Sequence, residues 1–162
     1  MNVLPKIHSL ETGPLDEAGL SQLAAVMATS LVAPLMVYLR GDLGAGKTTF
    51  TRAMLRKLGY KGIVKSPTYG LLERYTLSHF EVVHVDLYRI AEAGELEFLG
   101  LQDLHSSKSV FMIEWPERGD PHLAAPDLTI RFSHAGTERE LLFAFHTSIT
   151  ENLQIVLANS IQ

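Results

Sequence analysis

Residues 41–48 read Gly41-Asp42-Leu43-Gly44-Ala45-Gly46-Lys47-Thr48 and match the pattern G-x-x-x-x-G-K-[ST] at every fixed position. The stretch before them, residues 35–40, is apolar and short, which is typical of a buried strand. The stretch after them, residues 49–58, carries apolar residues four apart and is followed by Gly59, which predicts a helix and its end. A strand, a glycine-rich loop and a helix in this order form the phosphate-binding loop (P-loop) of nucleotide-binding proteins.

The fixed residues of this loop have defined tasks in phosphate binding. Glycines let backbone N–H groups turn toward phosphate oxygens, and the start of the following helix adds a favourable dipole. Lys47 supplies a positive charge for the β- and γ-phosphates, and the Thr48 hydroxyl can bind Mg²⁺. The sequence therefore predicts a protein that binds a nucleoside triphosphate with Mg²⁺. Its predicted contacts are Asp42, Leu43, Gly44, Ala45, Gly46, Lys47, Thr48 and Thr49, with Thr68 from a later loop.

The composition favours a single cytoplasmic domain. The chain has 162 residues, of which 46% are hydrophobic, and this suffices for one domain with a sizeable core. No apolar stretch reaches the length of a membrane span, residues 1–11 lack the pattern of a signal peptide, and cysteine is absent. The net charge of −4 is unfavourable for direct contact with a nucleic acid, so we expect any such role to run through a partner. We expect residues 1–162 to form one domain, with 1–15 and 150–162 at its periphery.

The remaining apolar patterns predict an α/β fold. Asp16 is placed to cap a helix that reaches about Leu31 along one apolar stripe. A helix is also predicted in the tail from Thr150. The expected architecture is a three-layer P-loop NTPase-like domain, with a mostly parallel central sheet and antiparallel C-terminal edge strands. Besides residues 35–40, strands are predicted at 71–76, 80–86, 110–115, 128–132 and 141–145.

The segment between the strands at 80–86 and 110–115 mixes acidic and apolar residues. Its glutamates are expected on a solvated face, and its large apolar residues are expected to pack inward. The glutamates are Glu92, Glu95 and Glu97, and the apolar residues are Leu96, Phe98, Leu99, Leu101 and Leu104.

Two predicted strands end in an acidic residue, Asp86 in one and Glu114 in the other. In P-loop proteins, carboxylates at the carboxyl ends of neighbouring strands face the metal and the attacking water. We therefore predict that Asp86 and Glu114 act in catalysis together with Lys47. Glu114 is preferred for the magnesium shell, beside Thr48, and Asp86 for orienting or deprotonating water, although the two roles could be exchanged.

Four further residues have a functional and a structural interpretation. Thr68 lies 20 residues beyond Thr48, where P-loop proteins return a segment to the γ-phosphate, but a turn threonine is the alternative. Arg89 and Arg118 are the nearest candidates for a positive clamp, and surface ion pairs are the alternative. His84 has no partner at metal-ligand spacing, which favours a core or hydrogen-bonding histidine.

The assembled motifs resemble those of the bacterial TsaE (YjeE) family, the small ATPase of tRNA threonylcarbamoyladenosine synthesis. They follow the family's order and spacing across residues 35–130. The matching stretches are Gly41-Asp42-Leu43-Gly44-Ala45-Gly46-Lys47-Thr48-Thr49-Phe50, Lys65-Ser66-Pro67-Thr68-Tyr69, His84-Val85-Asp86-Leu87-Tyr88-Arg89 and Glu114-Trp115-Pro116-Glu117-Arg118-Gly119.

The resemblance implies ATP hydrolysis that is weak alone and is stimulated by two partner subunits, TsaD and TsaB. It implies that tRNA is reached only indirectly, through that complex. The absence of an apolar stretch of about 18 residues predicts that no membrane is involved. The resemblance also implies that Thr48 and Glu114 lie by Mg²⁺, Lys47 by the phosphates, Thr68 in a switch-like loop and Asp86 near the attacking water.

Three rival functions remain open on the sequence alone. A P-loop small-molecule kinase would need an acceptor pocket and usually an arginine-bearing lid, and the stretch at residues 103–109 contains no arginine. A GTPase would need an [NT]-K-x-D motif, which the chain lacks. A nucleotide-dependent binding module that hydrolyses nothing is the third.

Overall fold

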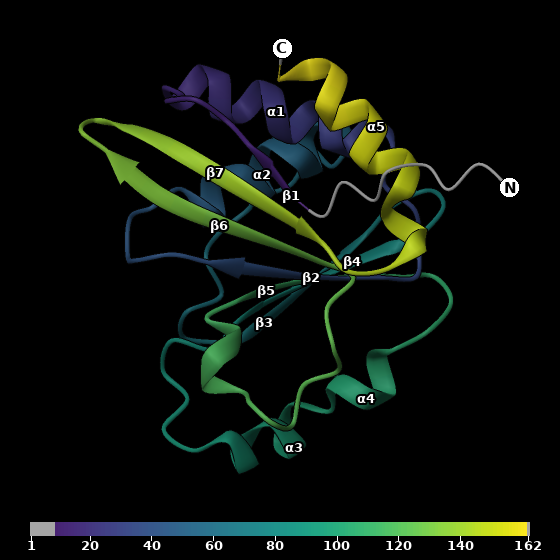
Figure 1. The fold of residues 1–162 in the computed structure, drawn as a ribbon. Helices are drawn as coiled ribbons and strands as arrows, with labels where there is room; N and C mark the ends of the chain where they lie inside the picture. Colours follow the sequence, from purple (N-terminus) through teal and green to yellow (C-terminus); the bar gives the residue numbers. More distant parts are fainter. Residues whose placement is uncertain (1–8, 162) are drawn as a thin grey trace, which may run out of the picture.

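The computed structural model describes residues 9–161 as a seven-stranded sheet with helices on both faces (Figure 1). The strands are β1 (Ser9–Glu11), β2 (Leu35–Arg40), β3 (Leu72–Thr76), β4 (Glu81–Asp86), β5 (Ser109–Glu114), β6 (Leu128–Ala135) and β7 (Glu138–Phe145). The α-helices are α1 (Glu17–Thr29), α2 (Lys47–Lys57), α3 (Leu96–Leu99), α4 (Leu101–Leu104) and α5 (Glu151–Ser160). Three 3-10 helices are η1 (Ala93–Glu95), η2 (Pro116–Arg118) and η3 (Ser148–Thr150).

The strands are ordered β1-β7-β6-β2-β5-β4-β3 across the sheet. The four central strands, β6, β2, β5 and β4, run parallel to one another. Strands β3 and β7 are antiparallel to their neighbours, and β1 pairs antiparallel with β7 beyond the hairpin. The predicted parallel sheet with antiparallel C-terminal strands is thus confirmed. The expected lead-in, residues 1–15, supplies the edge strand β1, and residues 1–8 lie outside the described part of the chain.

Strand β2 lies at the centre of the sheet and leads directly into the phosphate-loop sequence. Its first five residues are buried, because neighbouring strands flank it and helices cover both faces. Helix α2 begins at Lys47, two residues before the predicted start, and ends at Lys57, two residues before Gly59, which adopts a φ of 95°. The loop therefore opens at the carboxyl edge of the parallel strands, where α/β proteins bind ligands.

The helices form two layers around the sheet. Figure 1 shows α1, α2 and α5 on one face and α3 and α4 on the other. Each face has its own hydrophobic cluster, because successive residues of a buried strand point to opposite sides. In β5, for example, Met112 packs on the α2 side and Phe111 on the α3 side. The three-layer prediction is confirmed.

The helices of residues 9–161 are short, and none is long and apolar enough to cross a membrane. Helix α1 follows the predicted cap, because the Asp16 carboxylate accepts a hydrogen bond from the Gly19 N–H at 2.7 Å. The predicted tail helix is confirmed as α5, which packs Leu153 and Leu157 into the core on the α1 side.

The prediction that Phe98 packs inward is wrong, because its side chain is 91% exposed. Helix α3 has only four residues, and Leu96 already faces the core cluster. A residue two positions further along a helix points to nearly the opposite side, so Phe98 faces solvent. The neighbouring leucines at 99, 101 and 104 pack against the cluster as predicted, and the three glutamates are exposed.

Candidate nucleotide-binding site

The phosphate loop depends on glycines at positions where a side chain would be strained or would clash. Gly41, Gly44 and Gly46 have φ values of 149°, 74° and 103°, which other residues rarely adopt. A Cβ at Gly41 would lie 2.7 Å from the backbone oxygen of Phe132, and one at Gly46 would lie 2.9 Å from Leu20 Cδ2. The loop can hold this shape against the sheet and α1 only because these positions lack side chains.

We expect Gly41→Ala to destabilise the protein by about 3 kcal/mol, because the strained φ is combined with a clash against a fixed backbone oxygen. Gly136→Ala is the matched control. Gly136 also has a positive φ, 64°, but open space surrounds it in the β6–β7 turn, so about 1 kcal/mol is expected. Denaturant unfolding measures both values, and equal losses would contradict the packing argument.

Lys47 is the cation of the loop, and its side chain folds back over it. The residue is 4% exposed, and its ammonium donates hydrogen bonds to the carbonyl oxygens of Gly41 and, at 3.0 Å, of Asp42. The Trp115 ring centroid lies 4.5 Å from Nζ, in cation–π geometry. Burial lowers the pKa of Lys47, and nearby carboxylates, led by Glu114 and then Asp86, act in the opposite direction. The ammonium of Lys47 is therefore buried and lies near carboxylates.

Thr48, Glu114 and His84 form a connected group behind the loop. The Thr48 hydroxyl donates to Glu114 Oε1 at 3.0 Å, and His84 Nε2 lies 2.8 Å from the same oxygen. Glu114 is 3% exposed and His84 is fully buried. The prediction of a core, hydrogen-bonding histidine is confirmed. Glu114 is thereby fixed beside the first turn of α2.

Asp86 is held by a separate set of donors. Its Oδ2 accepts hydrogen bonds from the hydroxyls of Ser66 at 3.0 Å and Thr68 at 3.1 Å. Its Oδ1 accepts one from the Tyr88 backbone N–H at 2.9 Å. The loop that contains Thr68 is thus bound to the end of β4, and the two hydroxyls also contact each other at 2.8 Å.

The sheet register explains why the two acids meet. Asp86 and Glu114 are paired residues at the ends of the parallel strands β4 and β5, so their side chains share one face. His84 and Asp86 are two apart in β4 and share that face as well. Because Glu114 reaches Thr48, this face is the one that α2 covers. The structure therefore brings Lys47, Thr48, Thr68, Asp86 and Glu114 to one corner.

The other predicted contacts are placed less centrally. Leu43 is 61% exposed at the tip of the loop, where Asp42 and Gly44 are also exposed. The side chain of Ala45 is buried, and Thr49 lines an open groove between α1 and α2.

The two arginines considered as clamps both stack on aromatic rings. Arg118 lies near the ring of Trp115, with 5.8 Å between guanidinium carbon and centroid, and so adjoins the Lys47 corner. Arg89 stacks on Tyr69 at 4.1 Å, beside the Thr68 loop. Neither makes an ion pair within residues 9–161.

The residues present fit a magnesium nucleotide. The N-cap residue of helix α2 is Gly46, which has no side chain to cap the helix, so the first N–H groups of the helix remain available to a phosphate. Mg²⁺ is usually held by one or two protein side chains together with phosphate oxygens and water. Thr48 and Glu114 supply such a pair. No group of three histidine, aspartate or glutamate side chains in the described residues forms a separate metal site.

Two residues that contact the site, Ser66 and Arg139, have a weak signal or none in the sequence. In the sequence, Ser66 is marked only by its place in the stretch Lys65-Ser66-Pro67-Thr68-Tyr69, although its spacing of two from Thr68 allows both hydroxyls to reach one carboxylate. Arg139 donates to the Gly44 carbonyl at 3.0 Å from β7, 95 residues away in sequence, and no local pattern indicates such a contact.

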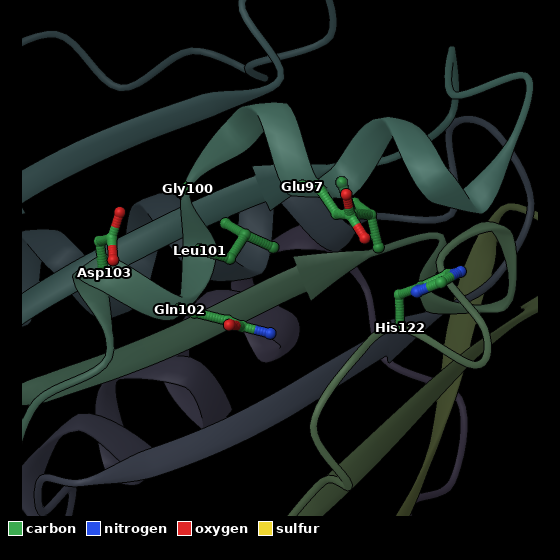
Figure 2. A pocket seen from close by; sticks show the side chains of 7 residues that line it. Glu97, Gly100, Leu101, Gln102, Asp103 and His122 are labelled. Atoms are coloured by element: carbon green, nitrogen blue, oxygen red, sulfur yellow. The ribbon is translucent and has the colours of Figure 1, made fainter.

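A separate hollow lies on the other side of the sheet and shares no lining residue with the loop. It encloses about 230 Å³ between α3, α4 and the segment that carries His122. Figure 2 shows Glu97, Gln102 and His122 at its border. These side chains are exposed and do not form a metal-binding group, so the loop corner remains the candidate site.

Comparison with known proteins adds independent information. The family described as "Threonylcarbamoyl adenosine biosynthesis protein TsaE" matches residues 15–141. The tRNA threonylcarbamoyladenosine biosynthesis protein TsaE of Haemophilus influenzae is 42% identical over 125 residues, 77% of this chain and 79% of the relative. The protein of the same name from Rickettsia conorii is 35% identical over 149 residues, 91% of this chain and 82% of the relative. The crystal structure of Bacillus subtilis YdiB superposes with a TM-score of 0.76 at 26% identity, over 95% of this chain and 97% of that one.

Proposed function

This chain belongs to the TsaE family, and we propose that it is a Mg²⁺-dependent ATPase that acts in tRNA threonylcarbamoyladenosine biosynthesis. The observation that carries the ATPase proposal is the convergence of Lys47, Thr48, Asp86 and Glu114 at one corner of the sheet. The biosynthetic role is proposed from the names of the relatives.

In the proposed reaction, the loop binds the phosphates through its backbone N–H groups and Lys47. The lysine exchanges its contacts with the Gly41 and Asp42 carbonyls for phosphate oxygens, which offer a full negative charge. When bound, Mg²⁺ would neutralise part of the phosphate charge. Thr48 and Glu114 would hold it, because their hydrogen bond already places both groups at the start of α2.

Asp86 is the proposed group for the attacking water. It would orient the water and accept its proton as the water oxygen bonds to the γ-phosphorus. The bond from that phosphorus to the bridging oxygen breaks, and ADP leaves with the electron pair. The hydroxyls of Ser66 and Thr68 support this assignment, since they fix the Asp86 carboxylate. Lys47 would balance the charge that develops on the phosphates.

The proposed partners are the TsaD and TsaB subunits, with tRNA reached only through them and the whole assembly in the cytoplasm. The chain's net charge of −4 suits a subunit that docks on protein.

We expect phosphate release from ATP to be slow for the purified chain and to rise at least tenfold when TsaD and TsaB are added. The reason is that partner contacts would complete a site whose loop and arginines are exposed on one side. The measurement is steady-state phosphate release from ATP. GTP is added as a competing nucleotide, and removal of Mg²⁺ by a chelator is the control. Phosphorylation of a metabolite, with no stimulation by TsaD and TsaB, would favour a small-molecule kinase instead.

A further inference from the structure

His84 lies next to the proposed magnesium ligand, and no role follows for it from the phosphate loop. The side chain is fully buried in β4, and its Nε2 is 2.8 Å from Glu114 Oε1. Its other ring nitrogen, Nδ1, is buried and has no hydrogen-bond partner within the described residues. We propose that His84 is a positioning residue, which donates from Nε2 to Glu114 and so fixes that carboxylate for magnesium; this rests on the proposed function.

The direction of the hydrogen bond follows from the acceptor. A carboxylate has no proton to donate, so its contact with an imidazole nitrogen requires the proton to be on that nitrogen. Glu114 Oε1 then accepts from two donors, the His84 ring and the Thr48 hydroxyl. With Oε1 held at both sides, the plane of the carboxyl group is fixed and Oε2 is the oxygen left to other ligands.

The register of the sheet makes this contact rigid. His84 pairs with Met112, two residues before Glu114 on β5, so the two side chains lie diagonally on one face of neighbouring strands. Both strands are buried at the centre of the sheet, and neither side chain can swing out to solvent. Since the contact with Glu114 is the ring's polar contact within the described residues, removing Glu114 would leave the buried ring without a hydrogen bond, and removing His84 would leave Glu114 with Thr48 as its donor.

The unpartnered Nδ1 of His84 favours a role in positioning Glu114 over a role in filling the core. A histidine kept only to fill the core could be replaced by an apolar residue of similar size, which would also avoid the cost of burying Nδ1. That cost is offset only if the ring does something that an apolar residue cannot do. Donation to Glu114 is such a task, in the way that groups around metal ligands orient them.

The first test uses three variants: His84→Leu, His84→Gln, and His79→Asn as a control at an exposed histidine. His84→Leu should lower kcat about tenfold or more and raise the Mg²⁺ concentration for half-maximal activity, with KM for ATP within about twofold. His84→Gln, whose amide N–H reaches the position of Nε2, should recover most of the loss. A His84→Leu protein with the kcat and Mg²⁺ dependence of the wild type would overturn the proposal.

The second test needs neither a variant nor turnover. The ¹⁵N chemical shifts of the His84 ring, measured in the wild-type chain without nucleotide, should show the proton on Nε2 and a bare Nδ1. A proton on Nδ1 alone would overturn the proposal, because Nε2 could not then donate to Glu114. If the wild-type chain hydrolyses no ATP, the proposed function fails, while the shifts still support or overturn the contact by themselves.

Discussion

Lys47→Ala is expected to abolish measurable ATP binding, with affinity reduced at least about 100-fold. The ammonium is the cation that the loop itself supplies, and it is almost fully buried. A charge that is already desolvated loses little solvation when it meets a phosphate, so its attraction is stronger than that of an exposed lysine. Removing it would leave the phosphates close to Glu114 and Asp86 with no opposing side-chain charge from the loop.

Calorimetric titration with a slowly hydrolysed ATP analogue and Mg²⁺ measures this effect. Lys57→Ala is the matched control, because Lys57 ends the same helix but is exposed, and its binding constant should stay within about twofold. Unchanged affinity for Lys47→Ala would remove the lysine from the phosphate site and with it the main support for the nucleotide proposal.

The sequence predicts the fold well where the signals are local. The strand at 35–40, the helix after the loop and the Asp16 cap each depend on residues within a few positions of one another, and each is present in the structure. The meeting of Asp86 and Glu114 could also be predicted, because both follow buried strands and parallel strands end at the same edge.

What the sequence does not predict depends on distant contacts. Phe98 has the same apolar character as Leu96, and only the shortness of α3 decides which of them faces the core. Arg139 reaches the phosphate loop from the far end of the chain. The bond from His84 to Glu114 joins two strands and depends on their register, which alternation within one strand cannot give.

We expect Asp86→Asn and Glu114→Gln each to lower kcat at least about 100-fold while leaving the fold intact. Both replacements keep the size of the side chain. The Gln carbonyl can still accept from Thr48 and His84. The Asn carbonyl can still accept from the Tyr88 N–H, while its NH₂ group donates to the Ser66 and Thr68 hydroxyls in place of accepting from them. A lower kcat would therefore result from the lost charge and basicity of the carboxylate and not from a change in packing.

The two variants should differ in how they respond to Mg²⁺, and this difference assigns the roles. In Glu114→Gln, added Mg²⁺ should increase the affinity for nucleotide less than it does in the wild type, because a neutral amide is a poorer ligand for a hard cation than a carboxylate. Asp86→Asn should bind Mg·ATP normally and fail in hydrolysis, since an amide cannot accept the proton of the attacking water. Calorimetry at several Mg²⁺ concentrations, paired with phosphate release, separates the cases, and Asp103→Asn serves as a control at an exposed acid. The opposite pattern would exchange the two roles, and wild-type turnover in both variants would place the chemistry elsewhere.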